Sequence, residues 1–511
     1  MNKEQIHATQ DTVNIEGFSK WLSIQSKSGE NAIKDKTTQW KTTLSKLKES
    51  SWRFACIRES LSDQDFSEDF KYFSDEIESE VSELINNPSL LEKESYDELL
   101  FMKDYTSPFN FIPYFLTFWS ILRIYILPGI SLLLPIMAVI IPYIILRYVF
   151  KMPLQVDKYL SMMLSLLQGK TPDFNNIHNS SSPFAGLSPL KIFTQYGTII
   201  ATLVQSIIQP YWSYKHLVKV DDIIINRGSK LIELSKFYDK IYERLSSLGI
   251  TWYINPIPRL SSHREAVAVA LKHPSYYKLA IKRIGEIEAT ICLAKKPELC
   301  PVRWSSNTNT FRLTDTFDYT VESSRRKPFS IDLSDKNSHS LLTGPNRGGK
   351  STILRSLVLS SLLAHTYGCS IGTDAELSPR DGIFVCLKPD DLPGSKSRFE
   401  REVEFTATTL RASSALVFID ELYHSTNPPD AFESSKIYCN QLWKKDGIVS
   451  VISTHMFNLV EQAPSDIKRI CCSASIEEGT NRVLFSYTLM PGMCTVSSVN
   501  ELLIENGMLM R

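Results

Sequence analysis

The 511-residue sequence has no net charge, since 56 Lys and Arg balance 56 Asp and Glu. A protein that grips nucleic acid usually has a basic excess, because contacts to phosphates supply most of the affinity. Overall neutrality therefore gives nucleic-acid binding no support, although a local basic patch stays compatible with it. The nine cysteines include no Cys-x-x-Cys pair and no Cys/His spacing typical of zinc. Neither a disulfide framework nor a zinc site is indicated.

Long hydrophobic runs are missing from the first part of the chain, which begins Met-Asn-Lys-Glu-Gln. We therefore expect no secretory signal peptide and a reducing, cytosol-facing environment. Residues 1–106 are polar, and apolar residues recur there every three or four positions in one stretch: Phe70, Phe73, Ile77, Val81 and Leu84. This spacing predicts the buried face of a helix, and 1–106 is interpreted as a polar helical region.

The composition changes abruptly over residues 107–150. Residues 107–122 carry no charge, Arg123 interrupts, and residues 124–146 are again uncharged. The second run is longer than the roughly 20 residues that cross a bilayer. The pattern predicts membrane-embedded helices, arranged as a hairpin with a break near residues 123–129. A buried core helix of a soluble domain is the alternative. A second uncharged stretch, 192–214, is rich in Thr, Gln and Ser, which favours an amphipathic or buried helix.

Helical periodicity returns in the rest of region 151–300. One apolar face comprises Leu231, Leu234, Phe237, Ile241 and Leu245, and Ser275 is a candidate cap of a further helix. Such helices serve either as levers coupled to the C-terminal region or as a passive scaffold.

A glycine-rich motif opens the C-terminal region. A short apolar strand at residues 340–343 leads into Gly-Pro-Asn-Arg-Gly-Gly-Lys-Ser-Thr, and a helical run starts at Ile353. This is GxxxxGK[ST] in the strand–loop–helix context of a phosphate-binding loop. Glycines let backbone N–H groups face phosphates, and the helix N-terminus adds its positive dipole end. The residues expected to bind ATP are Gly344, Pro345, Asn346, Gly348, Gly349, Lys350, Ser351 and Thr352.

Within this motif, Lys350 is expected to reach the β- and γ-phosphates, and the Ser351 hydroxyl to ligate Mg²⁺. Two further apolar runs, 415–419 and 448–453, suit buried strands of a parallel sheet. The first ends in Asp420-Glu421 and the second in Thr454-His455. Because α/β sheets bind ligands at the carboxyl ends of strands, Asp420 is a candidate Mg²⁺ ligand through water. Glu421 is the candidate base for the attacking water.

His455 is a candidate contact of the γ-phosphate or its water, and a structural role is the alternative.

Together these residues resemble the ATPase domain of the MutS family of DNA mismatch-repair proteins, over about residues 330–500. Residues 343–352 are similar to that family's TGPNxGGKST, 420–422 to its DEL and 453–455 to its ATH. Residues 395–399 with Glu402 are loosely similar to its GRSTF signature. The resemblance implies that Ser397 contacts the γ-phosphate bound to another subunit.

The resemblance further implies an α/β P-loop ATPase domain of the ABC/MutS type at 301–511, preceded by a mostly α-helical region. It implies ATP and Mg²⁺ as cofactors, and a homodimer or heterodimer through composite ATP sites. Binding of mismatched duplex DNA is implied by the family alone. Mismatch readers use a Phe-x-Glu wedge, whereas Phe66-Ser67-Glu68 lies in an acidic stretch.

Two functions are therefore favoured over a third, an ABC transporter subunit, which fits less well because the motifs are MutS-like and the apolar stretches are few. One is a mismatch-repair-type ATPase that binds DNA, and the other is a membrane-anchored MutS-like ATPase that acts on a membrane or a protein partner. The second would be membrane-associated, with its ATPase domain facing the cytosol or nucleus; otherwise the protein is soluble and intracellular.

Overall fold

The computed structural model describes residues 10–61, 65–86, 96–167, 189–307, 309–334, 337–387, 397–477 and 482–508. The chain forms two compact units that alternate along the sequence. The first unit comprises Met1–Glu78, Ile241–Ile254 and Ile281–Arg511, and the second comprises Ser79–Lys240 and Asn255–Ala280. The predicted domains, in contrast, follow one another along the sequence with boundaries at residues 106, 150 and 300. These boundaries remain predictions.

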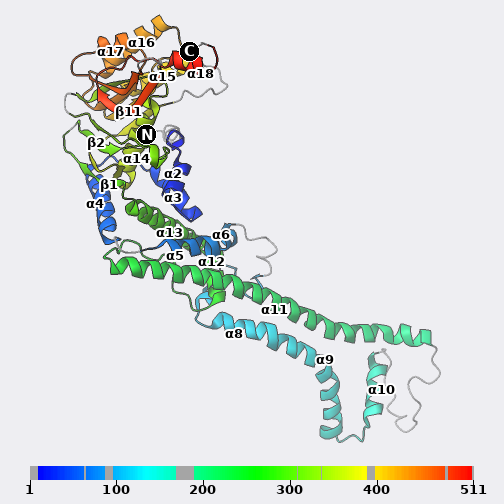
Figure 1. The fold of residues 1–511 in the computed structure, drawn as a ribbon. Helices are drawn as coiled ribbons and strands as arrows, with labels where there is room; N and C mark the ends of the chain where they lie inside the picture. The colour runs from blue at the N-terminus through cyan, green and yellow to red at the C-terminus, as the bar shows by residue number, and fades with distance from the viewer. Residues whose placement is uncertain are drawn as a thin grey trace. The chain divides into compact units, whose positions relative to one another are not determined.

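The second unit is helical throughout its described residues (Figure 1). Its elements are α6 (Ser79–Asn86), the 3₁₀ turn η2 (Ser107–Phe111), α8 (Phe115–Ile121), the π-helical turn η3 (Leu122–Ile126), α9 (Leu127–Ile144), the π-helical turn η4 (Ile145–Val149), α10 (Val156–Leu167), α11 (Pro189–Ser247, which enters the first unit at Ile241), α12 (His263–Lys272) and the start of α13 (Pro274–Lys295). Ser275, the predicted cap, lies inside the first turn of α13.

The first unit contains all the described strands. Its elements outside α11 and α13 are α2 (Ile15–Trp21), α3 (Lys27–Thr37), α4 (Leu44–Ser60), α5 (Ser67–Tyr72), the π-helical turn η1 (Phe73–Glu78), β1 (Leu299–Trp304), β2 (Phe311–Thr316), the 3₁₀ turn η6 (Ser323–Arg325), β3 (Phe329–Asp332), β4 (His339–Thr343), α14 (Lys350–Tyr367), β5 (Cys369–Ile371), β6 (Asp374–Leu377), β7 (Gly382–Cys386), α15 (Arg398–Arg411), β8 (Ala415–Ile419), α16 (Pro428–Leu442), β9 (Ile448–Ser453), α17 (Phe457–Glu461), β10 (Lys468–Ile476), β11 (Val483–Pro491) and α18 (Val499–Glu505).

Two sheets organise the first unit. The larger has the strand order β11-β10-β4-β9-β8-β7, in which only the edge strand β11 runs antiparallel to its neighbour. The three strands predicted from apolar runs are β4, β9 and β8, and they are adjacent. The smaller sheet has the order β3-β2-β6-β1-β5. Phe311 of β2 contacts Phe418 of β8, with ring centroids 6.1 Å apart, so the two sheets share apolar contacts.

Helix α14, which follows β4, is buried along nearly its whole length. The polar N-terminal segment helps to cover it. Lys41 donates from its backbone to the His365 carbonyl (3.1 Å) and from Nζ to the Thr366 carbonyl (2.9 Å). The Trp40 ring stacks on the His365 ring at 3.9 Å. Burial lowers the pKa of His365 to about 3, so this imidazole is neutral at physiological pH.

Two buried carboxylates hold the N-terminal end of α3. Glu288 of α13 accepts hydrogen bonds from the backbone of Gln25 (2.6 Å) and Ser26 (3.2 Å). Glu78 accepts from the backbone of Lys27 (2.9 Å) and Ser28 (2.6 Å). The first turn of a helix leaves its N–H groups without intrahelical partners, and carboxylates there also face the positive end of the dipole. Residues 10–61 are thereby tied to the unit that contains the sheets.

The predicted helical face in the N-terminal region is confirmed. Phe70, Phe73, Ile77, Val81 and Leu84 lie in the continuous run of α5, η1 and α6, and all five are buried. Phe66, at the start of this run, is 1% exposed, and the Arg244 guanidinium lies 4.0 Å from its ring centroid. A core phenylalanine of this kind cannot insert into DNA as a wedge.

Residues 115–149 form one continuous helix that is long and apolar enough to cross a membrane. The predicted break near residues 123–129 is wrong, because the π-helical turn η3 runs directly into α9. The chain instead reverses at residues 150–155, between η4 and α10. The predicted alternative, a buried core helix, also fails, since most of this helix is exposed.

Helix α11 is 59 residues long, so it extends for about 88 Å. Its buried positions include Leu231, Leu234, Phe237, Ile241 and Leu245, as predicted from their spacing. The uncharged stretch 192–214 is also part of α11, but its apolar residues from Val204 onward are exposed, so the expected buried helix is wrong for residues 204–214.

Gly228 allows α11 to pass close to the start of α12. A Cβ at this position would lie 2.1 Å from the His263 carbonyl oxygen. We predict that Gly228→Ala destabilises the protein by about 2 kcal/mol or more, because backbone has to move apart. Urea unfolding followed by circular dichroism measures this. Ser229→Ala, at the exposed next position, is the control and should change stability by less than about 0.5 kcal/mol. Equal midpoints for the two variants would contradict the close packing.

Candidate functional site

Three loops meet at one edge of the larger sheet. They follow β4, β9 and β8, which are neighbours and parallel, with Leu342 of β4 opposite Ser453 of β9 and Ile419 of β8 opposite Ile452. Their carboxyl ends therefore coincide, which is where open α/β sheets bind ligands. The loops contain the glycine-rich loop (residues 344–349), the Asp420-Glu421 pair and Thr454-His455. The structure thus brings the predicted motifs together.

Glycines are required in the glycine-rich loop at two positions. Gly344 has φ 148° and Gly349 has φ 98°, which L side chains rarely adopt. A Cβ at Gly344 would also lie only 2.9 Å from the Cβ of Cys472 on β10. The loop ends where α14 begins at Lys350, so the backbone N–H groups of that first helical turn have no intrahelical partner and are available to an anion.

Lys350 is buried at the start of α14. Its Nζ donates to the carbonyls of Gly344 (3.0 Å) and Pro345 (3.2 Å) and lies 3.2 Å from His455 Nε2. Burial lowers the pKa of Lys350, while the nearby Asp420 and Glu421 carboxylates oppose that effect. The ammonium is therefore held at the glycine-rich loop by acceptors and by negative charge.

A chain of hydrogen bonds links the three loops. Ser351 Oγ donates to one Asp420 oxygen at 2.5 Å, and Ser453 Oγ donates to the other. Ser453 Oγ in turn accepts from the Glu421 backbone at 2.9 Å. Both oxygens of Asp420 are thus fixed, and its carboxylate lies against the first turn of α14.

The Ser351–Asp420 pair has the donor chemistry of a magnesium site. Mg²⁺ prefers hard oxygen ligands, and it commonly takes only one or two from protein, with the others from phosphate and water. Among the residues that the structure describes, no group of three or more His, Cys, Asp or Glu could hold a metal. One hydroxyl and one carboxylate beside a phosphate-binding loop therefore fit Mg²⁺ better than a metal held by protein alone.

Glu421 and His455 form a second polar pair at this edge. Glu421 Oε1 lies 3.3 Å from His455 Nε2, and both side chains are 41% exposed. This hydrogen bond is the main cause of the lowered pKa of Glu421, so the carboxylate is ionised at neutral pH. The residue has φ 55°, a left-handed conformation that directs it away from the strand path taken by Asp420. The same His455 nitrogen faces Lys350, so it bonds either the cation or the carboxylate, depending on its tautomer.

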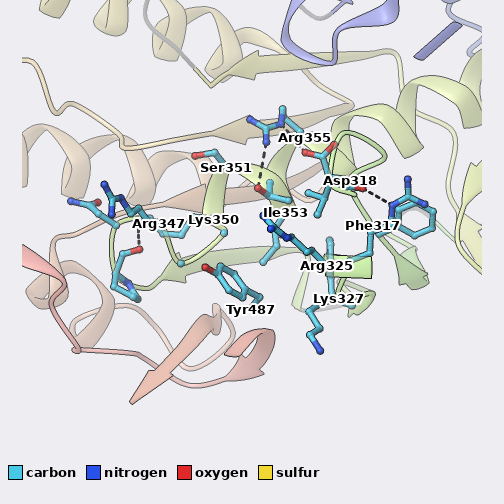
Figure 2. Close-up of a pocket in the computed structure, with 18 of the residues that line it drawn as sticks. Phe317, Asp318, Arg325, Lys327, Arg347, Lys350, Ser351, Ile353, Arg355 and Tyr487 are labelled. Atoms are coloured by element: carbon cyan, nitrogen blue, oxygen red, sulfur yellow. Dashed lines mark hydrogen bonds and ion pairs between the residues drawn. The ribbon is translucent and has the colours of Figure 1, made fainter. Parts of the chain in front are cut away.

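A cavity of about 690 Å³ adjoins the glycine-rich loop (Figure 2). Lys350, Ser351 and Glu421 lie on its lining, and Asp318 lies further along it, bonded through Oδ2 to Arg355 Nε at 2.9 Å. The remaining part of the lining, which sequence reasoning missed, is aromatic and basic. It includes Phe317, Arg325, Arg326, Lys327, Phe329 and Tyr487. These residues come from the β2–β3 connection, from β3 and from β11, so no local motif marks them.

Residues 340–501 match the family model of MutS domain V. The match covers this domain alone, and over these residues it supports membership of the MutS family. Domain V is the α/β ATPase domain of that family, whose members dimerise and bind DNA. The matched range begins in β4 and ends in α18, so it contains the glycine-rich loop, Asp420-Glu421, His455 and Tyr487. The aromatic and basic residues between Phe317 and Phe329 lie outside it.

The MutS-like signature segment lies at the start of α15. Ser397 caps this helix in a reciprocal capping box: its Oγ accepts from the Glu400 backbone (3.2 Å), and its own backbone donates to Glu400 Oε2 (2.7 Å). Further along α15, buried Glu402 accepts from Ser425 Oγ at 2.9 Å, and burial raises its pKa. Residues 395 and 396 of the signature lie outside the described residues.

We predict that Lys350→Ala lowers ATP affinity by about tenfold to a hundredfold, because charge-assisted hydrogen bonds to phosphate are lost. Titration with a fluorescent ATP analogue measures this. Lys436→Ala, on α16 and away from the cavity, is the matched control and should bind as the parent protein does. Equal affinity for the two variants would remove Lys350 from the site.

Proposed function

We propose that this protein binds ATP with Mg²⁺ in the cavity at the start of α14 and hydrolyses it. The observation that carries the proposal is that buried Lys350, the Ser351 hydroxyl and ionised Glu421 line one cavity, with the Asp420 carboxylate bonded to Ser351 beside it. Each has a distinct task in phosphoryl transfer, namely phosphate binding, metal binding and activation of water. The match to MutS domain V supports the same reaction.

The polyphosphate would lie on the glycine-rich loop, with residues 344–346 and 348–352 around it. Lys350 would exchange its carbonyl partners for the β- and γ-phosphate oxygens. Ser351 and Asp420 would hold Mg²⁺, which supplies positive charge against the charge that develops on the phosphates. Phe329 and Tyr487, at the aromatic part of the cavity, offer ring faces for stacking the adenine base.

Glu421 is the proposed base. Its low pKa keeps it able to accept a hydrogen bond from water, and its partner His455 orients it and lies within reach of the same water. In this proposal, Glu421 would accept the proton of a water that attacks the γ-phosphate in line.

Glu421→Gln should retain ATP binding and lower the turnover number by about a hundredfold or more, because the amide keeps the volume and loses the base. A phosphate-release assay at saturating ATP measures turnover, and the analogue titration measures binding. Glu461→Gln, at the end of α17, is the matched control and should be fully active. Undiminished turnover in Glu421→Gln would exclude this role, whereas joint loss of binding and turnover would indicate misfolding.

We further propose that two subunits form composite ATP sites, with Ser397 of one facing the γ-phosphate bound to the other. The exposed start of α15 supports this, because the positive dipole end of a helix attracts an anion. Ser397→Asp should block ATP-dependent dimerisation, because it preserves the cap and adds a negative charge toward phosphate. Ser397→Thr, which keeps both cap and hydroxyl, is the control.

Mixing Ser397→Asp with Lys350→Ala should restore part of the ATPase activity. In a mixed dimer, one composite site carries both defects and the other carries neither. Activity of the mixture is compared with that of each variant alone. No recovery, with mixed dimers shown to form by differently tagged subunits, would contradict composite sites.

The target of the ATP cycle has two candidates. Duplex DNA is implied by the family, although Phe66 of the Phe-x-Glu tripeptide is in the core and supports no wedge. A membrane is the second candidate, because the helix of residues 115–149 exposes an apolar surface that a soluble domain would bury. This observation favours the membrane-anchored ATPase.

A further inference from the structure

The described helices α8, η3, α9, η4 and α10, together with residues 204–214 of α11, share one property: each exposes large apolar side chains, most densely along α9 and η4. We refer to them as the apolar surface. Leu133, Leu134 and Ile136 of α9 are each more than half exposed. Monomeric soluble proteins rarely expose contiguous apolar patches of this extent, so this surface requires a partner.

The distribution of polar groups along α9 shows what kind of partner fits. Tyr125 and Arg123 lie just before α9, and Tyr143 and Arg147 lie at its end. Between the two tyrosines there are only uncharged residues, over a helix rise of about 27 Å. The hydrocarbon core of a bilayer is about 30 Å thick, and aromatic and basic residues concentrate at its two interfaces. The helix has this arrangement at both ends.

Contacts within the second unit place further aromatic and basic residues at the two ends of the uncharged segment between Tyr125 and Tyr143. At the first end, the Tyr125 ring lies 5.9 Å from that of Tyr214, and the Lys215 ammonium lies 5.7 Å from the Trp212 ring. At the other end, Arg147 donates to Tyr143 Oη (2.6 Å) and to a carbonyl of the reversing segment, that of Leu154 (3.2 Å). Each end of the uncharged helix is therefore a cluster of aromatic rings and cations.

Helix α10 returns along α9, as Figure 1 shows. Tyr159 Oη donates to the Val139 carbonyl at 2.7 Å, and its ring lies 5.1 Å from that of Tyr143. Prolines within α9 leave backbone carbonyls without an intrahelical donor, and a neighbouring helix can satisfy them. Pro142 removes the donor of the Ala138 carbonyl, and the Tyr159 hydroxyl binds the adjacent Val139 carbonyl. The bond therefore joins α10 to α9 beside this proline.

Residues 204–214 of α11 have a different pattern. Val204, Ile207, Ile208, Tyr211 and Trp212 recur at i, i+3, i+4, i+7 and i+8 and are all exposed. The intervening residues are uncharged polar ones and Pro210. An amphipathic helix of this kind, with aromatic residues and lysines at its end, suits the plane of a membrane interface rather than its centre.

The excess of basic residues in these apolar segments indicates that the lipid headgroups are anionic. Residues 107–167 and 189–220 contain seven Lys and Arg but one acidic residue, Asp157, in a chain that is neutral overall. Arg123, Arg147, Lys151, Lys215 and Lys219 are exposed, in two groups at the ends of the uncharged helix. Basic residues beside an apolar insertion segment are attracted to anionic lipid surfaces.

We propose that α9 crosses a phospholipid bilayer with anionic headgroups, with the α9–α10 reversal in the far headgroup layer and residues 204–214 of α11 in the near interface. The chain enters and leaves on the same side. This proposal rests on the membrane-anchored form of the proposed function, and it adds topology and lipid class. ATP turnover measured in detergent does not depend on the membrane topology. It therefore separates failure of the topology from failure of the proposed ATPase activity.

The first experiment is flotation of full-length protein, synthesised without detergent beside preformed vesicles. Protein should float with phosphatidylcholine vesicles and resist carbonate extraction, and it should partition at least tenfold better onto vesicles that also contain phosphatidylglycerol. Leu133→Asp combined with Ile140→Asp should lower partitioning by about a hundredfold or more, because central acids are costly in lipid. Ile437→Asp, at an equally exposed isoleucine of α16, is the matched control. Wild-type protein that stays soluble beside both vesicle types overturns the proposal.

The second experiment tests the topology. A membrane-impermeant amine reagent added outside intact vesicles should label Lys327 of the first unit but not Lys151, which should react only after detergent is added. Labelling of Lys151 in intact vesicles would show that α9 does not cross, and the proposal would fail.

The third experiment tests the charge. Lys215→Gln with Lys219→Gln should reduce the preference for anionic vesicles several-fold and leave flotation with neutral vesicles unchanged. Excess duplex DNA should not displace the protein from anionic vesicles. If DNA displaces it and the two lysines are needed for DNA binding, the cations serve nucleic acid and the lipid proposal is wrong. In detergent, the Asp variants should keep parental ATP turnover. Absence of turnover in the wild-type protein would instead count against the proposed ATPase.

Discussion

The hydrogen bond between Ser351 and Asp420 is the contact on which the site depends, because it joins the first turn of α14 to the end of β8 across 69 residues of sequence. Ser453 bonds the second Asp420 oxygen and the Glu421 backbone, so β9 is drawn into the same network. This arrangement is possible because parallel neighbouring strands end at one edge. A shift of α14 would therefore displace the glycine-rich loop, Asp420 and Glu421 together.

The position of α14 depends in turn on residues far from the motifs. Nearly all of its side chains are buried, and the N-terminal segment forms part of its cover through Trp40 and Lys41. Glu288 and Glu78 then fix the start of α3 beside this segment. The helical N-terminal residues consequently belong to the ATPase unit in a structural sense, although their sequence has no motif of the family.

The sheet edge that carries the motifs could be predicted from sequence because its signals are local: an apolar strand followed by a fixed motif determines where Lys350 and Glu421 lie. The aromatic part of the cavity could not, since Phe329 and Tyr487 meet only through the fold of two sheets. The predicted hairpin break was wrong because Arg123 interrupts the uncharged run and Gly129 is typical of a turn, whereas the structure accommodates them in a π-helical turn and the first turn of α9. The Thr, Gln and Ser content of 192–214 favours an amphipathic or a buried helix, and composition alone cannot separate the two; the exposed residues 204–214 exclude the buried one there.

The interleaving of the two units determines the order in which contacts become available during synthesis. Residues 10–61 emerge first, yet the partners of Trp40 and Lys41 lie in α14 and in the segment after β6, more than 300 residues later. At ribosomal rates of 5–20 residues per second, roughly 15–60 seconds pass before those partners exist. The apolar helices of the second unit are complete well before that point. The nascent chain therefore exposes its most hydrophobic part while its ATPase core is still unfinished, so a membrane or a chaperone has to receive α9 first.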